Sequence, residues 1–155
     1  MLCILQRVIA DELSELGVGV LVAAARLTRL GSRDVTALPP AAMRLLGRLD
    51  ELGPTRISEL AKADRSSQPT MSTLVQRQEE SGLVRREPDP ADSRASLISL
   101  TDAGLAVLDR GRREAGAVIA SRLSQLPAND IATLEAAVIV MHKILTLEPM
   151  EANAR

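Results

Sequence analysis

Apolar residues recur at steps of three and four near both ends of the chain, and this spacing is that of one face of an α-helix. Such runs span residues 2–30, 105–126 and 131–145. A fourth run, residues 43–49, follows the pair Pro39-Pro40, and proline is well tolerated in the first turn of a helix. The pattern therefore predicts long terminal helices on either side of a shorter central segment.

Glycine and proline mark where these helices weaken or end. Gly17 and Gly19 form a weak point within the first helix, and residues 31–34 end it. Pro127 separates the last two helices. The last helix is followed by residues 150–155, for which we expect a frayed tail.

The central segment predicts two short helices. Residues 55–57 suit a short extended piece, and Ser58 is a candidate N-cap for the first of the two helices. Residues 64–67 form a turn. The second helix then extends over residues 68–80 and is closed by Gly82.

A β-hairpin is expected next. Two runs that contain apolar residues, 83–84 and 97–100, flank a segment rich in proline, aspartate and serine, which are turn residues. We therefore predict a hairpin with a long loop. A lone hairpin is marginally stable in water, so it must lie against the two short helices. Thr101 is a good N-cap for the long helix that follows.

The hairpin carries the spacing DPxDxR, from Asp89 to Arg94, and continues into LTxxG, from Leu100 to Gly104. In these motifs the chain resembles the MarR family of bacterial transcription regulators. The resemblance implies a mainly α fold with a small β-hairpin wing. A winged helix-turn-helix DNA-binding module is then flanked by N- and C-terminal dimerisation helices. The expected domains are residues 1–35 for the N-terminal helix, 36–104 for the DNA-binding lobe and 105–155 for the C-terminal helices.

Composition narrows the classes of function. The chain of 155 residues lacks Phe, Tyr and Trp, so it has no aromatic platform on which single-stranded nucleic acid could stack. Its net charge is −1, and residues 54–101 contain seven basic and seven acidic side chains. A DNA-binding role must therefore depend on where the arginines point and not on how many there are.

The second short helix has two different faces. At ~100° per residue, Met71, Leu74, Val75 and Gln78 fall on one face, and this face is mostly core. Its N-terminal backbone N–H groups suit a phosphate, while glutamine and arginine side chains fit base edges. The candidate DNA-binding residues of this helix and the hairpin are Ser66, Ser67, Gln68, Pro69, Thr70, Ser72, Thr73, Arg77, Arg86, Asp92 and Arg94. The alternative is that Ser67 is only a helix cap and Arg77 a solvated charge.

Arg94, near the tip of the hairpin, suits the narrow minor groove, where the potential is strongly negative. The resemblance implies that Asp92 orients the guanidinium of Arg94; the alternative is that Asp92 only shapes the turn. Arg86 is expected to meet a phosphate or a carboxylate of the wing. The chain also departs from the family at Gln78, where a buried leucine is usual, which predicts looser packing of the helix.

Two further positions depart from the family pattern. Ser66 stands at a commonly apolar turn position, and Thr73 stands where arginine is frequent. Fewer contacts to DNA are therefore expected than in a typical member.

Other chemistry is sparse. The single cysteine fits a reducing, cytoplasmic compartment, and no apolar run is long enough to cross a membrane. Cys3 is either a passive thiol or a redox sensor with only Arg7 one helical turn away. With one histidine, His142, we expect no metal and no cofactor.

The sequence favours a homodimeric regulator that binds double-stranded DNA, most simply a repressor reading a pseudo-palindromic operator. The resemblance adds a small lipophilic effector, bound in a pocket that would be aliphatic here, although apolar stripes are more often core. The alternative is a helical protein–protein adaptor whose winged module no longer binds DNA. An enzyme is not expected, because the chain has no phosphate-binding glycine loop and no nucleophile–base arrangement.

Overall fold

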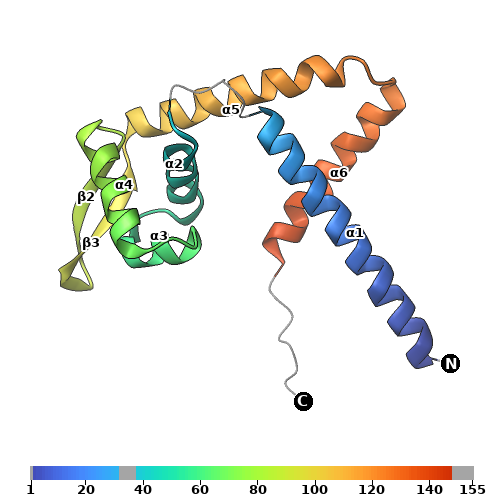
Figure 1. Cartoon of the computed structure of the whole chain (residues 1–155), viewed down its shortest axis with the longest axis horizontal. Coiled ribbons are helices and arrows are strands. Elements are labelled where there is room, and N and C mark those ends of the chain that lie inside the picture. Colours follow the sequence, from blue (N-terminus) through green and yellow to red (C-terminus); the bar gives the residue numbers. More distant parts are fainter. Residues whose placement is uncertain (1, 32–37, 148–155) are drawn as a thin grey trace. The chain divides into compact units, whose positions relative to one another are not determined.

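The computed structural model describes residues 2–31 and 38–147 and, within these ranges, all side chains except those of residues 2–9 and 93. The chain divides into two compact units, Met1–Val118 and Ile119–Arg155. The elements of the described ranges are α1 (Leu2–Gly31), α2 (Pro40–Leu52), β1 (Thr55–Arg56), α3 (Ile57–Ala63), α4 (Gln68–Glu80), β2 (Val84–Asp89), β3 (Asp92–Leu100), α5 (Asp102–Leu123) and α6 (Ala128–Thr146) (Figure 1). This confirms the predicted fold class.

The terminal helices form where the apolar spacing predicts them. α1 continues through Gly17 and Gly19, since each glycine costs a helix only about 1 kcal/mol. The predicted turn at residues 32–34 and the predicted tail at residues 150–155 lie outside the described residues. None of the helices in the described ranges is long and apolar enough to cross a membrane.

The elements α2, β1, α3, α4, β2 and β3 and the start of α5 form the winged lobe, which is held together by an aliphatic core. Pro40 opens α2, as expected, and Gly53 with φ 69° ends it. The buried side chains of α2, α3, α4, the sheet and α5 form one cluster: Leu45, Leu46, Leu49, Leu60, Ala61, Met71, Val75, Leu83, Val84, Ile98 and Leu108. Burial of a side chain of this size contributes about 1.5–3 kcal/mol, so the cluster is the main source of the lobe's stability.

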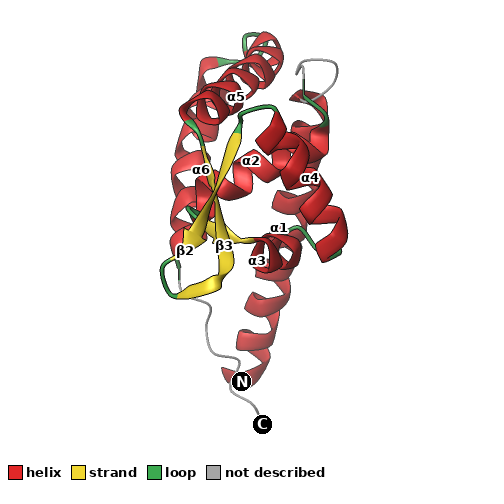
Figure 2. Ribbon diagram, turned by 90° about the vertical axis from the view of Figure 1, so that its left-hand side faces the viewer, coloured by secondary structure: helices red, strands yellow, loops and turns green. Residues whose placement is uncertain are grey.

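The three strands form one antiparallel sheet in the order β1-β3-β2, in which the short β1 pairs Arg56 with Leu97. β2 and β3 form the long arms of the wing (Figure 2). The predicted long loop is wrong, because β2 continues through Pro88 and only Pro90 and Ala91 lie between the strands. β2 is an edge strand, where proline is tolerated, and the register shifts next to Pro88.

The start of α3 also differs from the prediction. Ser58 is not the N-cap; Arg56 occupies that position, with an extended backbone and no side-chain capping hydrogen bond. Because β1 pairs with β3 up to Arg56, the helix starts directly after the strand, at Ile57. Ser58 therefore lies within the first turn of α3, where it is exposed.

A hydrogen-bonded junction connects α4, the wing and α5. Gly82 has φ 71°, which turns the chain out of α4 into β2. The hydroxyl of Thr101 donates to the carbonyl of Gly82 at 2.7 Å and accepts the N–H of Gly104 at 3.0 Å, so Thr101 is the predicted N-cap. The N–H of Thr101 donates to the carbonyl of Leu83 at 3.2 Å. α5 is thus fixed against the start of the wing.

Gly104 makes this junction possible because its Cα lies against the main chain of the residue before β2. A Cβ at Gly104 would lie 2.0 Å from the carbonyl oxygen of Leu83. We expect Gly104→Ala to lower the free energy of unfolding by about 1–3 kcal/mol or more, since backbone must move to relieve the overlap. Chemical denaturation followed by far-UV circular dichroism measures this.

Gly116→Ala is the matched control on the same helix, because a Cβ there meets nothing within 4 Å. It should be neutral or stabilise the protein by up to about 1 kcal/mol through helix propensity. Equal effects of the two substitutions would contradict a specific close approach at Gly104.

Candidate nucleic-acid interface

α4 has the two faces that the periodicity predicts. Met71, Val75 and Gln78 are buried and Leu74 is half-buried. On the outer side the exposed residues are Ser67, Gln68, Pro69, Thr70, Ser72, Thr73, Gln76 and Arg77. α4 therefore packs on the core with one side and presents a polar surface on the other.

The hydroxyl groups at the start of α4 mostly serve the helix itself. Ser67 is the N-cap and its oxygen accepts the N–H of Thr70 at 3.3 Å, while Thr73 donates to the carbonyl of Pro69 at 3.0 Å. The hydroxyl of Ser66 is buried and has no hydrogen-bond partner among the residues that the structure describes. Ser66 therefore does not present its hydroxyl to a ligand on this surface.

Gln68 and Arg77 are different. Within the described part of the chain, neither side chain has a hydrogen-bond or ion-pair partner, and both are exposed. Their donors are free to bind an external group. The prediction that Arg77 is a solvated charge and the prediction that it contacts DNA are both compatible with this placement.

Arg86 pairs with a different carboxylate from the one expected. Its Nε lies 3.5 Å from Oε2 of Glu79, which belongs to α4 and not to the wing. Arg85 instead donates to Ser99 at 3.1 Å and lies 3.3 Å from Glu87. Arg86 thus links the base of the wing to α4. The two elements are close in space because only residues 81–83 separate the end of α4 from the start of β2.

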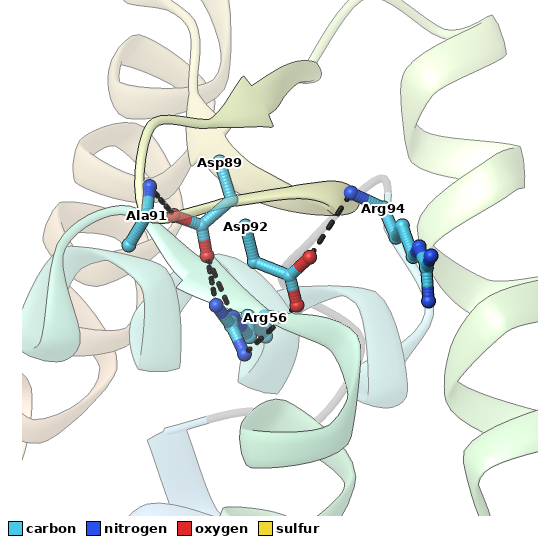
Figure 3. Close-up of polar contacts among 5 residues, drawn as sticks. All are labelled: Arg56, Asp89, Ala91, Asp92 and Arg94. Carbon is cyan, nitrogen blue, oxygen red and sulfur yellow. Dashed lines mark hydrogen bonds and ion pairs between the residues drawn. The ribbon is translucent and has the colours of Figure 1, made fainter.

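Near the wing tip, Asp92 does not orient the guanidinium of Arg94. Its Oδ1 accepts the backbone N–H of Arg94 at 3.1 Å, and its Oδ2 lies 3.9 Å from Arg56 (Figure 3). The alternative reading, an aspartate that shapes the turn, is therefore the one the structure supports. Arg94 is exposed, its guanidinium points away from Asp92, and it has no ion-pair partner among the described residues.

Sequence reasoning missed the contact between Arg56 and Asp89. Nε of Arg56 donates to Oδ2 of Asp89 at 2.6 Å, and Asp89 is only 7% exposed. The N–H of Ala91 donates to the other oxygen at 2.8 Å. The backbone hydrogen bond from Ala91 and then the Arg56 side chain hold the pKa of Asp89 below its ordinary value of 3.8.

A polar cavity of about 350 Å³ lies between the start of α4 and the wing. Ser58 and Gln68 line it from the two helices, and three arginines, Arg56, Arg86 and Arg94, line it from the sheet. Arg56 and Arg86 are paired with carboxylates, so Arg94, which has no such partner among the described residues, is the cation best placed to attract an anion such as a phosphate. No sequence motif indicated Ser58 or Arg56, because they come together only through the pairing of β1 with β3.

The remaining candidates add no chemistry to this site. The side chains of Cys3 and Arg7 lie outside the described residues. Nδ1 of His142 lies 2.9 Å from the carbonyl oxygen of Val138 on its own helix. Across the described ranges, no three histidine, cysteine or carboxylate side chains gather closely enough to hold a metal ion.

Gln78 permits a test of how α4 is anchored. It is buried, and within the described ranges its Oε1 has no hydrogen-bond partner. We expect Gln78→Leu to raise the free energy of unfolding by about 1–3 kcal/mol, because an unsatisfied buried acceptor is removed at similar volume. Differential scanning calorimetry measures the change, and Gln76→Leu, at an exposed position, should bring no such gain. A less stable Gln78→Leu protein would show that Oε1 is satisfied.

Asp89 gives a pH prediction. Its pKa is lower in the folded state than in the unfolded chain, so ionised Asp89 stabilises the fold fully above pH 3.8. This contribution is lost as the pH falls through the lower, folded-state pKa. The melting temperature of the wild type should therefore exceed that of Asp89→Asn at neutral pH, and the gap should close in acid.

The control for this pH prediction compares the melting temperatures of Arg56→Met and of the double variant Arg56→Met, Asp89→Asn. There, the gap in melting temperature that Asp89→Asn produces should be smaller, since one of the groups that lowers the pKa is absent. A gap that stays constant down to the acid transition would refute the assignment.

Comparison with known proteins supports the resemblance to the MarR family independently of the motifs. Residues 38–96 match the model of the MarR family. The HTH-type transcriptional repressor NicR of Pseudomonas putida is 39% identical over 61 residues, which cover 39% of each chain. The chain thus spans less than half the length of the curated relatives it matches.

Solved structures of other proteins share the fold over most of this chain. A transcriptional regulator of Thermotoga maritima is 24% identical with a TM-score of 0.69, covering 87% of this chain and 99% of that one. A MepR variant of S. aureus bound to an oligodeoxyribonucleotide is 19% identical with a TM-score of 0.60, covering 84% and 97%. These likenesses establish a shared fold. They agree with the match at residues 38–96, in which the winged lobe is similar to the MarR family.

Proposed function

We propose that this chain is a transcription regulator that binds double-stranded DNA, acting as a repressor. The observation that carries the proposal is the placement of free donors on one lobe. The exposed face of α4 and the guanidinium of Arg94, which pairs with no described residue, lie on the lobe that also holds the polar cavity. A helix of this kind fits the major groove, and a wing arginine fits the minor groove beside it.

Each part of the surface has a distinct role in this proposal. Gln68 and Arg77 carry the free donors that read base edges, and Arg94 enters the minor groove. A backbone phosphate occupies the cavity, close to the start of α4. Residues with engaged or apolar side chains contribute van der Waals contact to the DNA: Ser67, Pro69, Thr70 and Thr73. The exposed hydroxyl of Ser72 contacts a phosphate. Ser66 shapes the turn from inside.

The comparisons support this reading. The relative NicR is named a transcriptional repressor, and the MepR variant that shares the fold is bound to DNA. The shared region with NicR is the size of the winged lobe, so DNA binding is the part of its activity that the resemblance supports.

The active form in this proposal is a homodimer. Apolar side chains of the terminal helices are exposed in the single chain: Leu13, Leu16, Val18, Leu21, Val22 and Leu27 on α1, and Leu134, Val138, Ile139, Val140, Met141, Ile144 and Leu145 on α6. So much exposed apolar surface marks an association site. A two-fold dimer places two α4 helices one DNA turn, ~34 Å, apart on a pseudo-palindromic operator.

An effector would act through the same lobe. A cavity of about 230 Å³ lies between α2, the end of α4 and α5, and its apolar lining includes Leu38, Met43, Leu83 and Val107. This apolar part of the lining supports the proposal of a small lipophilic effector, with Ser81, Arg110 and Glu114 as polar groups beside it. Such a molecule releases DNA only if it binds the DNA-free conformation more tightly.

An adaptor that does not bind DNA is the second candidate. Three of the wing and cavity arginines, Arg56, Arg85 and Arg86, already pair with carboxylates of their own chain. A DNA-binding protein loses affinity steeply with salt, because counterions are released from the phosphates. An adaptor shows no such dependence.

The decisive experiment measures binding of the purified protein to its own upstream DNA at several salt concentrations. We expect sequence-selective binding that weakens as salt rises. Arg94→Ala should lower the affinity by roughly tenfold or more, because an arginine contact to DNA contributes about 1–3 kcal/mol.

Arg112→Ala is the control variant, since Arg112 pairs with Asp50 between α5 and α2 and lines no part of the polar cavity. Its affinity should match the wild type. If the dimeric wild type shows no selective or salt-dependent binding, the regulator proposal is refuted and the adaptor is favoured.

A further inference from the structure

The wing is anchored at its far end by charge and not by apolar packing. Along β2 the first residue, Val84, and the last, Asp89, are buried, and the four residues between them are exposed. The side chain buried at the far end of β2 is therefore a carboxylate. It is held by Arg56, which lies 33 positions earlier in the chain and belongs to β1.

A continuous series of contacts extends from Arg56 to the backbone of Arg94. Nε and a terminal nitrogen of Arg56 bind one oxygen of Asp89 at 2.6 and 2.5 Å. The other oxygen of Asp89 accepts the N–H of Ala91 and so fixes the two-residue turn. Arg56 also lies 3.9 Å from Asp92, which accepts the N–H of Arg94 at 3.1 Å (Figure 3).

These contacts set the path of the backbone from which Arg94 projects. The guanidinium of Arg94 itself has no partner in the described part of the chain, so its position depends on its main chain. Without the Arg56 side chain, the turn keeps its hydrogen bonds but loses the ion pairs that hold it to β1. The tip of a two-stranded ribbon is then free to swing, because such a ribbon is marginal when unsupported.

We propose that Arg56 is a positioning residue for DNA binding, which holds the wing through Asp89 so that Arg94 meets the minor groove. The proposal rests on the proposed DNA-binding function. It differs from a direct role of Arg56, in which this arginine, 41% exposed at the polar cavity, simply contacts a phosphate.

Asp89→Asn separates the two roles by the sign of its effect. Removing a negative charge beside DNA should strengthen binding if Coulomb attraction alone matters. If Asp89 is the support of the wing, the substitution should instead weaken binding, by roughly tenfold, in the range of a lost arginine contact. Arg56→Met should weaken binding to a similar degree.

A double-mutant cycle with Arg94 tests whether Arg56 acts through it. Arg56→Met and Asp89→Asn should each lose most of their effect on affinity in an Arg94→Ala background. Arg112→Met is the matched control, because it breaks another ion pair of the same unit without touching the wing. It should leave the affinity unchanged in both backgrounds.

A measurement without DNA keeps the test independent of the proposed function and of folding. Backbone amide hydrogen exchange should be faster at Ala91 and Arg94 in Arg56→Met, while the amides of α2 and α4 keep their protection. Because the chain lacks aromatic residues, global folding is checked by far-UV circular dichroism and calorimetry. If Arg56→Met does not fold, Asp89→Asn carries the same measurements.

Three results would overturn the proposal: unchanged exchange at the wing tip, tighter DNA binding by Asp89→Asn, or losses for Arg56→Met and Arg94→Ala that simply add. Failure of the proposed function is a separate outcome, recognised when the wild type binds no DNA selectively at low salt. In that case the hydrogen exchange result still decides whether Arg56 holds the wing.

Discussion

The close approach of the α5 backbone to the start of the wing is the constraint on which the lobe depends. At Gly104 there is no room for a side chain against the carbonyl of Leu83, and Thr101 bridges the same place by hydrogen bonds to Gly82 and Gly104. The end of α4, the start of β2, the end of β3 and the start of α5 all meet at this junction. A shift here would move α4 and the wing together, which explains why the LTxxG spacing is tied to the wing motif.

Some arginines of the lobe form ion pairs within it, and others remain available to bind DNA. The acidic and basic side chains of the lobe nearly balance in number, and several arginines form ion pairs within the lobe: Arg56 with Asp89, Arg86 with Glu79 and Arg44 with Asp64. These ion pairs are partly exposed, so each contributes little stability, but each sets a geometry. Arg77 on α4 and Arg94 on the wing have no carboxylate partner among the described residues, and neither does Arg65 in the turn before α4. A balanced composition is thus compatible with DNA binding, provided that the few free cations are well placed.

Local chemistry predicted most of the fold. The three- and four-residue spacing predicted the helices and the buried side of α4, and Thr101 and Gly82 marked real ends. The predictions were wrong where contacts between segments distant in the sequence determine the local structure. Ser58 is not a cap because strand pairing at Arg56 fixes where α3 starts, and Pro88 stays in β2 because that strand is at the edge. The candidate site shows the same division, since the exposed face of α4 follows from helical geometry alone. The partners of Arg86 and Asp92 depend instead on β2 lying beside α4 and on β1 pairing with β3, so Arg56 gave no local signal at all.

A charged anchor suits the wing better than an apolar one. The wing must project from the lobe to reach a groove, so little apolar surface can be buried at its tip, and this chain has no aromatic side chain to bury. An arginine–carboxylate pair needs little area and is directional, which apolar contact is not. Asp89 is buried while Arg56 remains partly exposed, so the desolvation cost falls on one group, which is compensated by hydrogen bonds from Arg56 and Ala91. The wing is therefore stiff where its backbone must direct Arg94, and the arginine side chain itself stays free to adapt to DNA.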